Sequence, residues 1–125
     1  MKTVLIIEDE EDFQRIVERI LSPAGFRLEK AASAEEGWEK ILRCRPDLAL
    51  VDWNLPGQSG PEFCRKLRDD ARFKNLPVIL LTVRNLPEDQ LHGLRESGAD
   101  LYLTKPIDPE ELLARIQSLF NLMER

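Results

Sequence analysis

The chain is poor in the residue types that build disulfide frameworks and transition-metal sites. Its 125 residues include two cysteines, Cys44 and Cys64, and a single histidine, His92. The cysteines form no CxxC pair, and no histidine stands near them at metal-ligand spacing. These absences argue against a disulfide-stapled secreted domain and against a zinc site. We expect two reduced thiols and a cytoplasmic location.

Long apolar runs and basic clusters are also missing. No segment approaches the roughly 20 apolar residues that cross a bilayer, and the first apolar run, at residues 4–7, is followed at once by acidic residues. We therefore expect neither a membrane segment nor a signal peptide. The 18 lysines and arginines are scattered, and the formal net charge is -5. This chain by itself is not expected to bind nucleic acid through the phosphates.

What the chain does contain is an alternation of short apolar runs with helical patterns. The runs at residues 3–7, 48–51 and 77–82 are rich in branched side chains, as in strands buried on both faces, and residues 26–30 and 100–104 are weaker strand candidates. Between them, apolar residues recur at helical spacing over 13–21 and 112–120. Ser33 is a candidate N-cap, and Pro109 stands at the first position of the last helix.

This order of elements predicts one α/β domain over residues 1–125. Five strand–helix units imply a parallel sheet with helices on both faces, because right-handed crossovers place successive helices according to strand order. The most economical architecture is a doubly wound, five-stranded, flavodoxin-like sheet with strand order 2-1-3-4-5. No internal repeat or linker is visible.

Polar residues gather where the predicted strands end. Glu8 and Asp9 follow the first strand, and Asp52 follows the third. Ligands of open α/β sheets bind beyond the carboxyl ends of the strands, so these carboxylates should meet there. Three converging carboxylates repel one another unless a cation holds them. Oxygen ligands without histidine or cysteine suit Mg²⁺, which we expect as the cofactor.

Two further strand ends supply groups that neutralise a phosphate. Thr82 ends the fourth strand with a hydroxyl, and Lys105 follows the fifth strand with a compact positive charge. A carboxylate oxygen of Asp52 held beside a metal can attack phosphorus and form an acyl phosphate. Asn54, two residues later, can offer its backbone carbonyl to the metal. Trp53, which stands between them, is expected to be partly exposed.

These residues resemble the receiver domain of bacterial two-component response regulators, which is related in fold to the chemotaxis protein CheY. The resemblance rests on four fragments in order, "VLIIEDEE", "DWNLPGQSG", "PVILLT" and "GADLYLTKP", and it extends over essentially the whole chain. The wording of "EDE" and "DWNLPGQSG" is closest to the OmpR/PhoB class. The chain would then be a single receiver domain and a signalling switch, with self-phosphorylation and autodephosphorylation activity.

The resemblance implies a role for each site residue. Asp52 would accept a phosphoryl group from a histidine kinase, and Thr82 and Lys105 would contact the phosphoryl oxygens. Mg²⁺ would be held by Glu8, Asp9, Asp52 and the Asn54 carbonyl. The Lys105–Pro106 peptide bond is typically cis in this family. Tyr102 occupies the position of an aromatic switch residue that responds to Thr82.

The resemblance also implies a readout surface, formed by the fourth helix, fifth strand and fifth helix at about residues 86–120, through which receivers of the OmpR/PhoB class form homodimers. Asp100, Glu111 and Arg115 fit the charged pairs of that class, whereas Gln90, His92 and Leu101 depart from them. Class-typical dimerisation therefore stays an open alternative. Val83, after Thr82, replaces a commonly small residue, and we expect it to slow attack at the phosphoryl group.

Two rival functions fit parts of the pattern. A phosphatase of the haloacid-dehalogenase type also uses an aspartate nucleophile and Mg²⁺, but it requires an acid two residues after the nucleophile, where this chain has Asn54. A pseudo-receiver would keep the fold as a binding scaffold, but such domains usually lose one of the acids, the threonine or the lysine.

Overall fold

The structure is a computed structural model, and it describes residues 1–83, 92 and 95–123. Its central element is a parallel sheet of five strands in the order β2-β1-β3-β6-β7. The strands are β1 (Thr3–Ile7), β2 (Arg27–Ala31), β3 (Leu48–Asp52), β6 (Val78–Val83) and β7 (Leu101–Lys105). Counted along the chain as five sheet strands, this is the predicted order 2-1-3-4-5, and the predicted fold class is confirmed.

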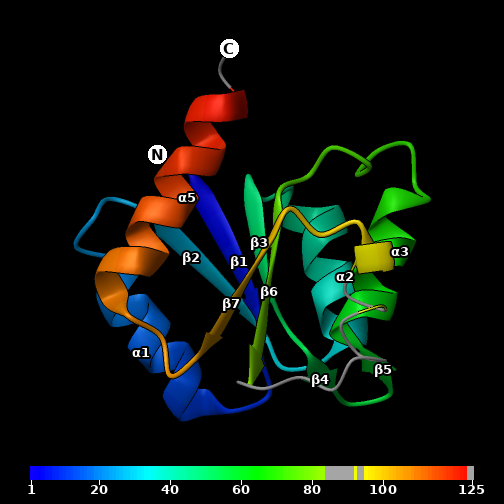
Figure 1. The fold of residues 1–125 in the computed structure, drawn as a ribbon, viewed down its shortest axis with the longest axis horizontal. Coiled ribbons are helices and arrows are strands. Elements are labelled where there is room, and N and C mark those ends of the chain that lie inside the picture. Colours follow the sequence, from blue (N-terminus) through cyan, green and yellow to red (C-terminus); the bar gives the residue numbers. More distant parts are fainter. Residues whose placement is uncertain (84–91, 93–94, 124–125) are drawn as a thin grey trace.

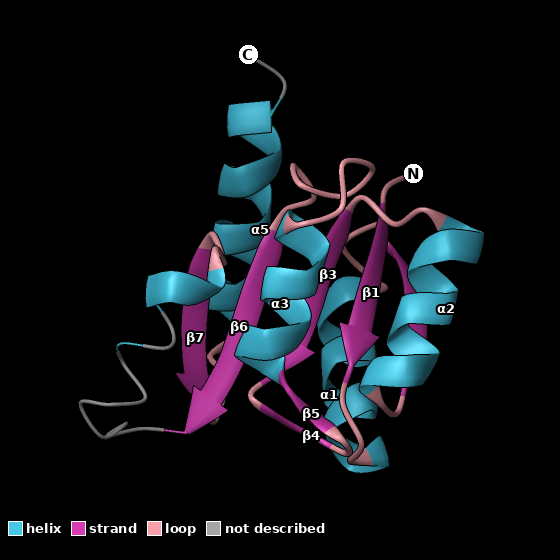
Figure 2. Ribbon diagram, turned by 90° about the vertical axis from the view of Figure 1, so that its right-hand side faces the viewer, coloured by secondary structure: helices cyan, strands magenta, loops and turns pink. Residues whose placement is uncertain are grey.

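Helices cover both faces of the sheet. Helices α1 (Glu11–Leu21) and α5 (Pro109–Met123) lie on one face, whereas α2 (Ala34–Cys44) and α3 (Gly60–Arg68) lie on the other (Figures 1 and 2). The chain between β6 and β7 falls largely outside the described residues, and the predicted fourth helix lies mostly in that segment. Residues 95–97 are helical, and Gly98 follows with φ +84°.

Each face of the sheet has its own apolar core. Successive side chains of β1 point to opposite faces, so this strand contributes to both cores. Leu5 and Ile7 pack with residues of α2 and α3, whereas Val4 and Ile6 pack with residues of α1 and α5. All four side chains are fully buried. The continuous apolar run is therefore explained by burial on both faces of a central strand.

Local signals at the helix ends agree with the sequence in part. Ser33 caps α2, since its hydroxyl accepts a hydrogen bond from the Glu36 amide at 3.1 Å, as predicted. The same helix ends without glycine: Arg45 takes the left-handed conformation at φ 47°, and its amide donates to the Ile41 carbonyl. The residue after it, Pro46, cannot continue the helix.

The loop after β3 contains a feature that the sequence patterns did not reveal. Two short antiparallel strands, β4 (Asn54–Leu55) and β5 (Gln58–Ser59), form a small hairpin there. Gly57, at φ +80°, lies in its turn. Within the described residues, no helix has the length and apolar character needed to span a bilayer.

Candidate functional site

The carboxyl ends of the parallel strands meet at one edge of the sheet (Figure 1). Asp52 is the last residue of β3 and Lys105 is the last of β7, and β6, which carries Thr82, lies between these strands. A cleft of about 330 Å³ opens at this edge. It is lined by Asp9, Glu10, Asp52, Trp53, Asn54, Thr82, Val83 and Lys105.

The Lys105 ammonium pairs with two of the acidic groups. Its Nζ atom lies 2.7 Å from Glu8 Oε2 and 2.9 Å from Asp52 Oδ1. The same Nζ lies 4.3 Å from the centroid of the Phe13 ring, a cation–π contact from α1. One lysine thus joins the ends of three strands and the start of α1.

The pKa values of these three groups follow from burial and from their mutual contacts. Burial raises the pKa of Asp52, and the hydrogen bond and charge of Lys105 only partly oppose this. Burial likewise raises the pKa of Glu8 against the hydrogen bond from Lys105. Burial lowers the pKa of Lys105, but its hydrogen bonds to the Glu8 and Asp52 carboxylates raise it by more, so the pKa is raised overall.

Glu8 is held in place by hydrogen bonds to neighbouring residues as well as by Lys105. Its side chain is fully buried, and Oε1 accepts the Glu10 amide at 3.2 Å. Gln14 of α1 donates to the Glu8 carbonyl at 2.6 Å and to the Ala31 carbonyl at 3.3 Å. The Gln14 side chain therefore connects α1 to the ends of β1 and β2 beside the cleft.

Three carboxylates form a group that fits a hard divalent cation. One oxygen each from Glu8, Asp9 and Asp52 lies within 4.8 Å of the others. Glu8 and Asp52 are buried, whereas Asp9 is exposed. Carboxylate oxygens with open positions for water are the donors that Mg²⁺ prefers. The predicted acids are thus brought together, and Asn54 lines the same cleft.

The β4–β5 hairpin is held against the end of β3, the strand that precedes it. The Gly60 amide donates to the Trp53 carbonyl at 2.7 Å, and a Cβ atom at Gly60 would lie 2.3 Å from the Asp52 carbonyl oxygen. We expected Trp53 to be partly exposed, and this was wrong: it is buried in the core beneath α2 and α3. Trp53 also lines the cleft, so this residue belongs both to the core and to the site.

The other predicted residues are placed as follows. Thr82 is buried, and its hydroxyl donates to the Val83 carbonyl at 3.4 Å. Val83 is 58% exposed and lines the cleft, and Tyr102 is 50% exposed on β7. The Lys105–Pro106 peptide bond is cis, as predicted. Gln90 lies outside the described residues.

Two residues beside the site were missed by sequence reasoning. Gln14 lies at helical spacing from the buried Val17 and Leu21, and a polar residue in such a stripe signals a buried hydrogen-bonding role. Phe13 carries no comparable signal. Its spacing predicts only a core position, and its contact with Lys105 depends on the packing of α1 against the end of β7.

Comparisons with known proteins agree with this site. The family model of the response regulator receiver domain matches residues 4–117. The chain belongs to the response regulator receiver family. It is 38% identical over 120 residues to the phosphate regulon transcriptional regulatory protein PhoB of Pseudomonas aeruginosa, covering 96% of this chain and 52% of that protein. This receiver therefore spans about half the length of that relative.

Solved structures give the same family. The chain is similar to the signal receiver domain of a signal transduction histidine kinase from Syntrophus aciditrophicus, with a TM-score of 0.93 and 30% identity, covering 100% of this chain and 94% of that one. It is also similar to the chemotaxis response regulator CheY4 of Vibrio cholerae, with a TM-score of 0.87 and 32% identity, covering 95% and 98%. The fold is that of a CheY-like signalling switch.

Proposed function

We propose that this receiver accepts a phosphoryl group on Asp52 from a histidine kinase and thereby changes the surface it offers to an output domain or partner. The observation that supports this most directly is the position of Lys105, which lines the cleft and whose ammonium lies 2.9 Å from Asp52 Oδ1. A phosphoryl group bound to Asp52 would arrive beside a fixed positive charge.

The proposed chemistry is a transfer between two side chains. An Asp52 carboxylate oxygen attacks the phosphorus of a phosphohistidine, a P–O bond forms, the P–N bond breaks, and the imidazole leaves with the electron pair and takes a proton from solvent. Lys105 and the Thr82 hydroxyl stabilise the negative charge on the phosphoryl oxygens. Water then attacks the phosphorus of the acyl phosphate, the bond to the Asp52 oxygen breaks, and the carboxylate and inorganic phosphate are released. Both steps are activities of the receiver itself.

We propose Mg²⁺ as the cofactor, held by Glu8, Asp9, Asp52 and the Asn54 carbonyl. The support is the donor set, since oxygen atoms of the three carboxylates lie within 4.8 Å of one another. Bound there, the ion would offset the repulsion between carboxylates and phosphoryl oxygens. Lys105 already pairs with two of these acids, so it positions them before a ligand arrives.

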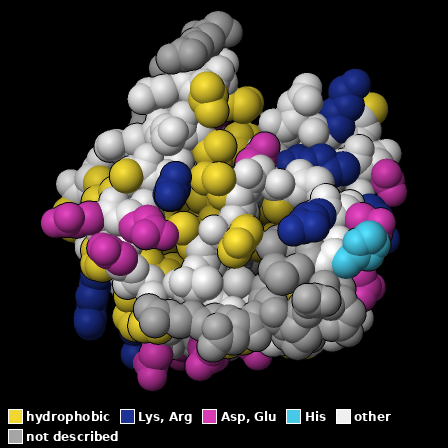
Figure 3. Space-filling view, in the orientation of Figure 1, with side chains coloured by type: hydrophobic (Ala, Val, Ile, Leu, Met, Phe, Trp, Pro, Cys, Tyr) yellow, Lys and Arg dark blue, Asp and Glu magenta, His cyan; other side chains and the backbone are white. Residues whose placement is uncertain are grey.

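The proposed readout involves β7 and α5. Tyr102 is half-exposed on β7, two residues before Thr104, which pairs in register with Thr82 of β6. Hydrophobic side chains gather along the face that carries β7 and α5 (Figure 3). We propose that contact of Thr82 with the phosphoryl group changes the position of Tyr102 and hence this face.

Dimerisation through the same face is the proposal with the least support. Glu111 and Arg115 are exposed on α5, as a charged interface requires. Asp100, however, is already paired with Arg68 of its own chain at 3.0 Å. A dimer through this face would therefore use fewer intermolecular pairs than the OmpR/PhoB pattern provides.

The rival functions are less well supported. Asn54, in place of an acid, lines the cleft two residues after Asp52, which disfavours a phosphatase of the haloacid-dehalogenase type. All the acids, Thr82 and Lys105 lie together at one sheet edge, which disfavours a pure scaffold. The free thiols Cys44 and Cys64 suit the cytoplasm, which we propose as the compartment.

The decisive test is the intact mass of the protein after incubation with Mg²⁺ and acetyl phosphate. We expect a gain of one phosphoryl group in the wild type and in Asp69→Asn, which changes an exposed carboxyl group outside the cleft. We expect no gain in Asp52→Asn or with EDTA. A phosphorylated Asp52→Asn protein, or an unmodified wild type under every donor and metal condition, would contradict the proposal.

Mg²⁺ binding has its own test. Trp53 adjoins Asp52 and Trp38 lies elsewhere, on α2, so the variant Trp38→Phe isolates the Trp53 fluorescence. We expect a saturable change with millimolar Mg²⁺ that Asp9→Asn weakens. A flat titration in the Trp38→Phe protein, with the fold intact by circular dichroism, would favour the scaffold function.

A further inference from the structure

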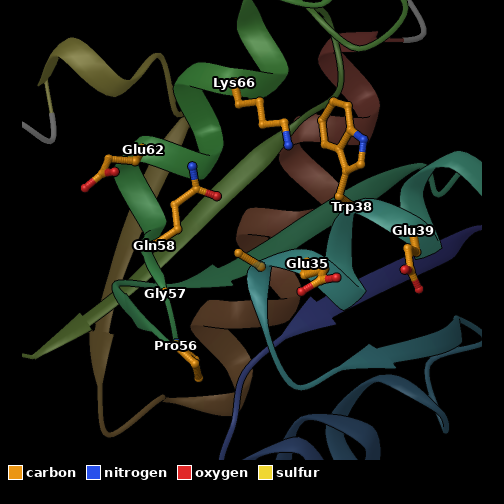
Figure 4. Close-up of a pocket in the computed structure, with 9 residues that line it drawn as sticks. Glu35, Trp38, Glu39, Pro56, Gly57, Gln58, Glu62 and Lys66 are labelled. Carbon is orange, nitrogen blue, oxygen red and sulfur yellow. The ribbon is translucent and has the colours of Figure 1, made fainter.

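A second pocket, of about 460 Å³, lies between α2, the β4–β5 hairpin and α3 (Figure 4). It shares no lining residue with the cleft at Asp52. Its lining residues are Ala34, Glu35, Trp38, Glu39, Pro56, Gly57, Gln58, Glu62 and Lys66. The proposed phosphoryl chemistry uses none of them.

One wall of the pocket is a fixed aromatic ring. The Trp38 indole contacts Phe63 edge-on, with ring centroids 6.3 Å apart at 84°, and Phe73 at 5.7 Å and 79°. These two core residues fix the position of the indole ring, and Trp38 is nevertheless only half-buried. The ring therefore presents a preformed face to the pocket.

A cation of the chain itself already lies against that face. Lys66 reaches from α3 toward the indole, and its Nζ atom lies 4.2 Å from the ring centroid (Figure 4). No carboxylate among the described residues forms a salt bridge with Lys66. This contact has the cation–π geometry in which a ring face attracts positive charge.

The remaining charged groups of the pocket are acidic. Glu35 and Glu39 stand one helical turn apart on α2, and Glu62 lies on α3. All three are exposed, and none is ion-paired with a lysine or arginine of the described chain, in contrast to Glu18, Glu29 and Asp100. Three acids and one lysine give the lining a net charge of -2.

We propose that this pocket binds an arginine side chain from a basic segment of a partner protein. A guanidinium is planar, so it can stack on the Trp38 face while it remains close to the acidic lining that Glu35 and Glu39 of α2 provide. The ammonium of Lys66 occupies that face in the free protein and is displaced on binding. The charge of the lining selects a cationic partner, and the planar wall selects arginine over lysine.

The test uses N-acetyl-arginine methylamide as the probe and follows the ¹⁵N-labelled protein by NMR. We expect the Trp38 indole N–H and the Gly57 amide to shift in a saturable way, whereas the uncharged citrulline analogue causes no shift. The Trp38→Phe variant assigns the indole signal, since Trp53 is the other tryptophan. Equal shifts with citrulline, or arginine-dependent shifts only around Asp9 and Asp52, would overturn the proposal.

Two variants distinguish arginine binding in this pocket from non-specific attraction of cations to an acidic protein. Lys66→Met removes the internal competitor and should tighten arginine binding by about threefold, and Glu39→Gln should weaken it by about threefold. Glu110→Gln makes the same charge change at the exposed start of α5 and should have no effect. Equal weakening in Glu39→Gln and Glu110→Gln, or no gain in Lys66→Met, would contradict the assignment.

A dilution series of the protein without the probe identifies the alternative occupant. If the Trp38 and Gly57 signals shift with protein concentration alone, a second copy of this chain fills the pocket, and the assignment to a separate partner is wrong. None of these outcomes depends on phosphorylation of Asp52, so the site can be tested even if the proposed function fails.

Discussion

Arg68 and Asp100 form a salt bridge of 3.0 Å that joins the end of α3 to the residue before β7. The same Asp100 oxygen accepts the Val78 amide at 2.8 Å. Arg68 also donates to the Leu76 carbonyl at 2.7 Å and to the Gly98 carbonyl at 2.8 Å. One guanidinium thus joins the end of α3 to the chain that enters β6 and to the chain that enters β7.

Replacing Arg68 by lysine should destabilise the domain. An ammonium cannot satisfy these separate acceptors in a planar arrangement, so we expect a loss of roughly 1–3 kcal/mol in the free energy of unfolding. Urea denaturation measures it. Arg65→Lys is the control, because Arg65 lies 3.8 Å from Glu96 on the surface, and it should change stability by less than about 0.5 kcal/mol. Equal effects would show that Arg68 is no more than a surface charge.

Gly37 brings α2 against β1 and should not tolerate a side chain. A Cβ atom there would lie 2.5 Å from Ile7 Cδ1, so Gly37→Ala should cost roughly 1–3 kcal/mol by overpacking. Ile7→Val removes that methyl group, and the double variant should recover part of the loss. Unfolding of the two single variants and the double variant measures the coupling. Strictly additive losses would show that the two residues do not meet.

Cys64 should be inert toward thiol reagents in the folded protein. Burial raises the pKa of its thiol from 9.0 to about 11. In a Cys44→Ser background, labelling at pH 8 should therefore be slow and should accelerate sharply in urea. Rapid labelling of the folded protein would contradict the burial of this thiol.

The same shift makes stability dependent on alkaline pH. The folded thiol holds its proton above the pH at which the unfolded thiol loses it, so stability is fully present below pH 9 and falls between pH 9 and about 11. The full loss is roughly 2–3 kcal/mol. Comparing the pH dependence of unfolding in wild type and Cys64→Ala measures it, and identical pH profiles would refute this origin.

Val83 should lengthen the lifetime of the phosphorylated protein. Val83 is exposed and lines the cleft together with Thr82, so it would obstruct the approach of water or a donor to a phosphoryl group on Asp52. Val83→Ala should speed both phosphorylation by acetyl phosphate and hydrolysis by several-fold. Intact mass followed over time measures both rates, and unchanged rates would remove steric crowding as an explanation.

The order of the sheet strands could be predicted because β1, β3 and β6 are buried apolar runs rich in branched residues, whereas β2 and β7, at the two edges of the sheet, are partly exposed and gave a weaker signal. The β4–β5 hairpin could not, because two-residue strands are too short to carry a periodic pattern. The burial of Trp53 could not be predicted from the sequence either. Its neighbours Asp52 and Asn54 are polar, and only the turn of the chain after β3 directs the indole into the core.

The candidate site was predictable as a set of residues but not as a set of contacts. Position at strand ends indicated Asp52, Thr82 and Lys105, since topology alone brings such residues together. That Lys105 pairs with Glu8 as well as with Asp52, and lies over Phe13, depends on side-chain directions that no spacing encodes.

The hairpin after Asp52 has a rigid base and an open tip. Its base is clamped at Gly60, where a Cβ atom would meet the Asp52 carbonyl, whereas a Cβ atom at Gly57 would have no neighbour within 4 Å. The tip has space for a fluorescent reporter, but the φ of +80° at Gly57 strains any other residue there. A dye is therefore better attached at the exposed Pro56 next to it, where it would report on the loop that follows Asp52.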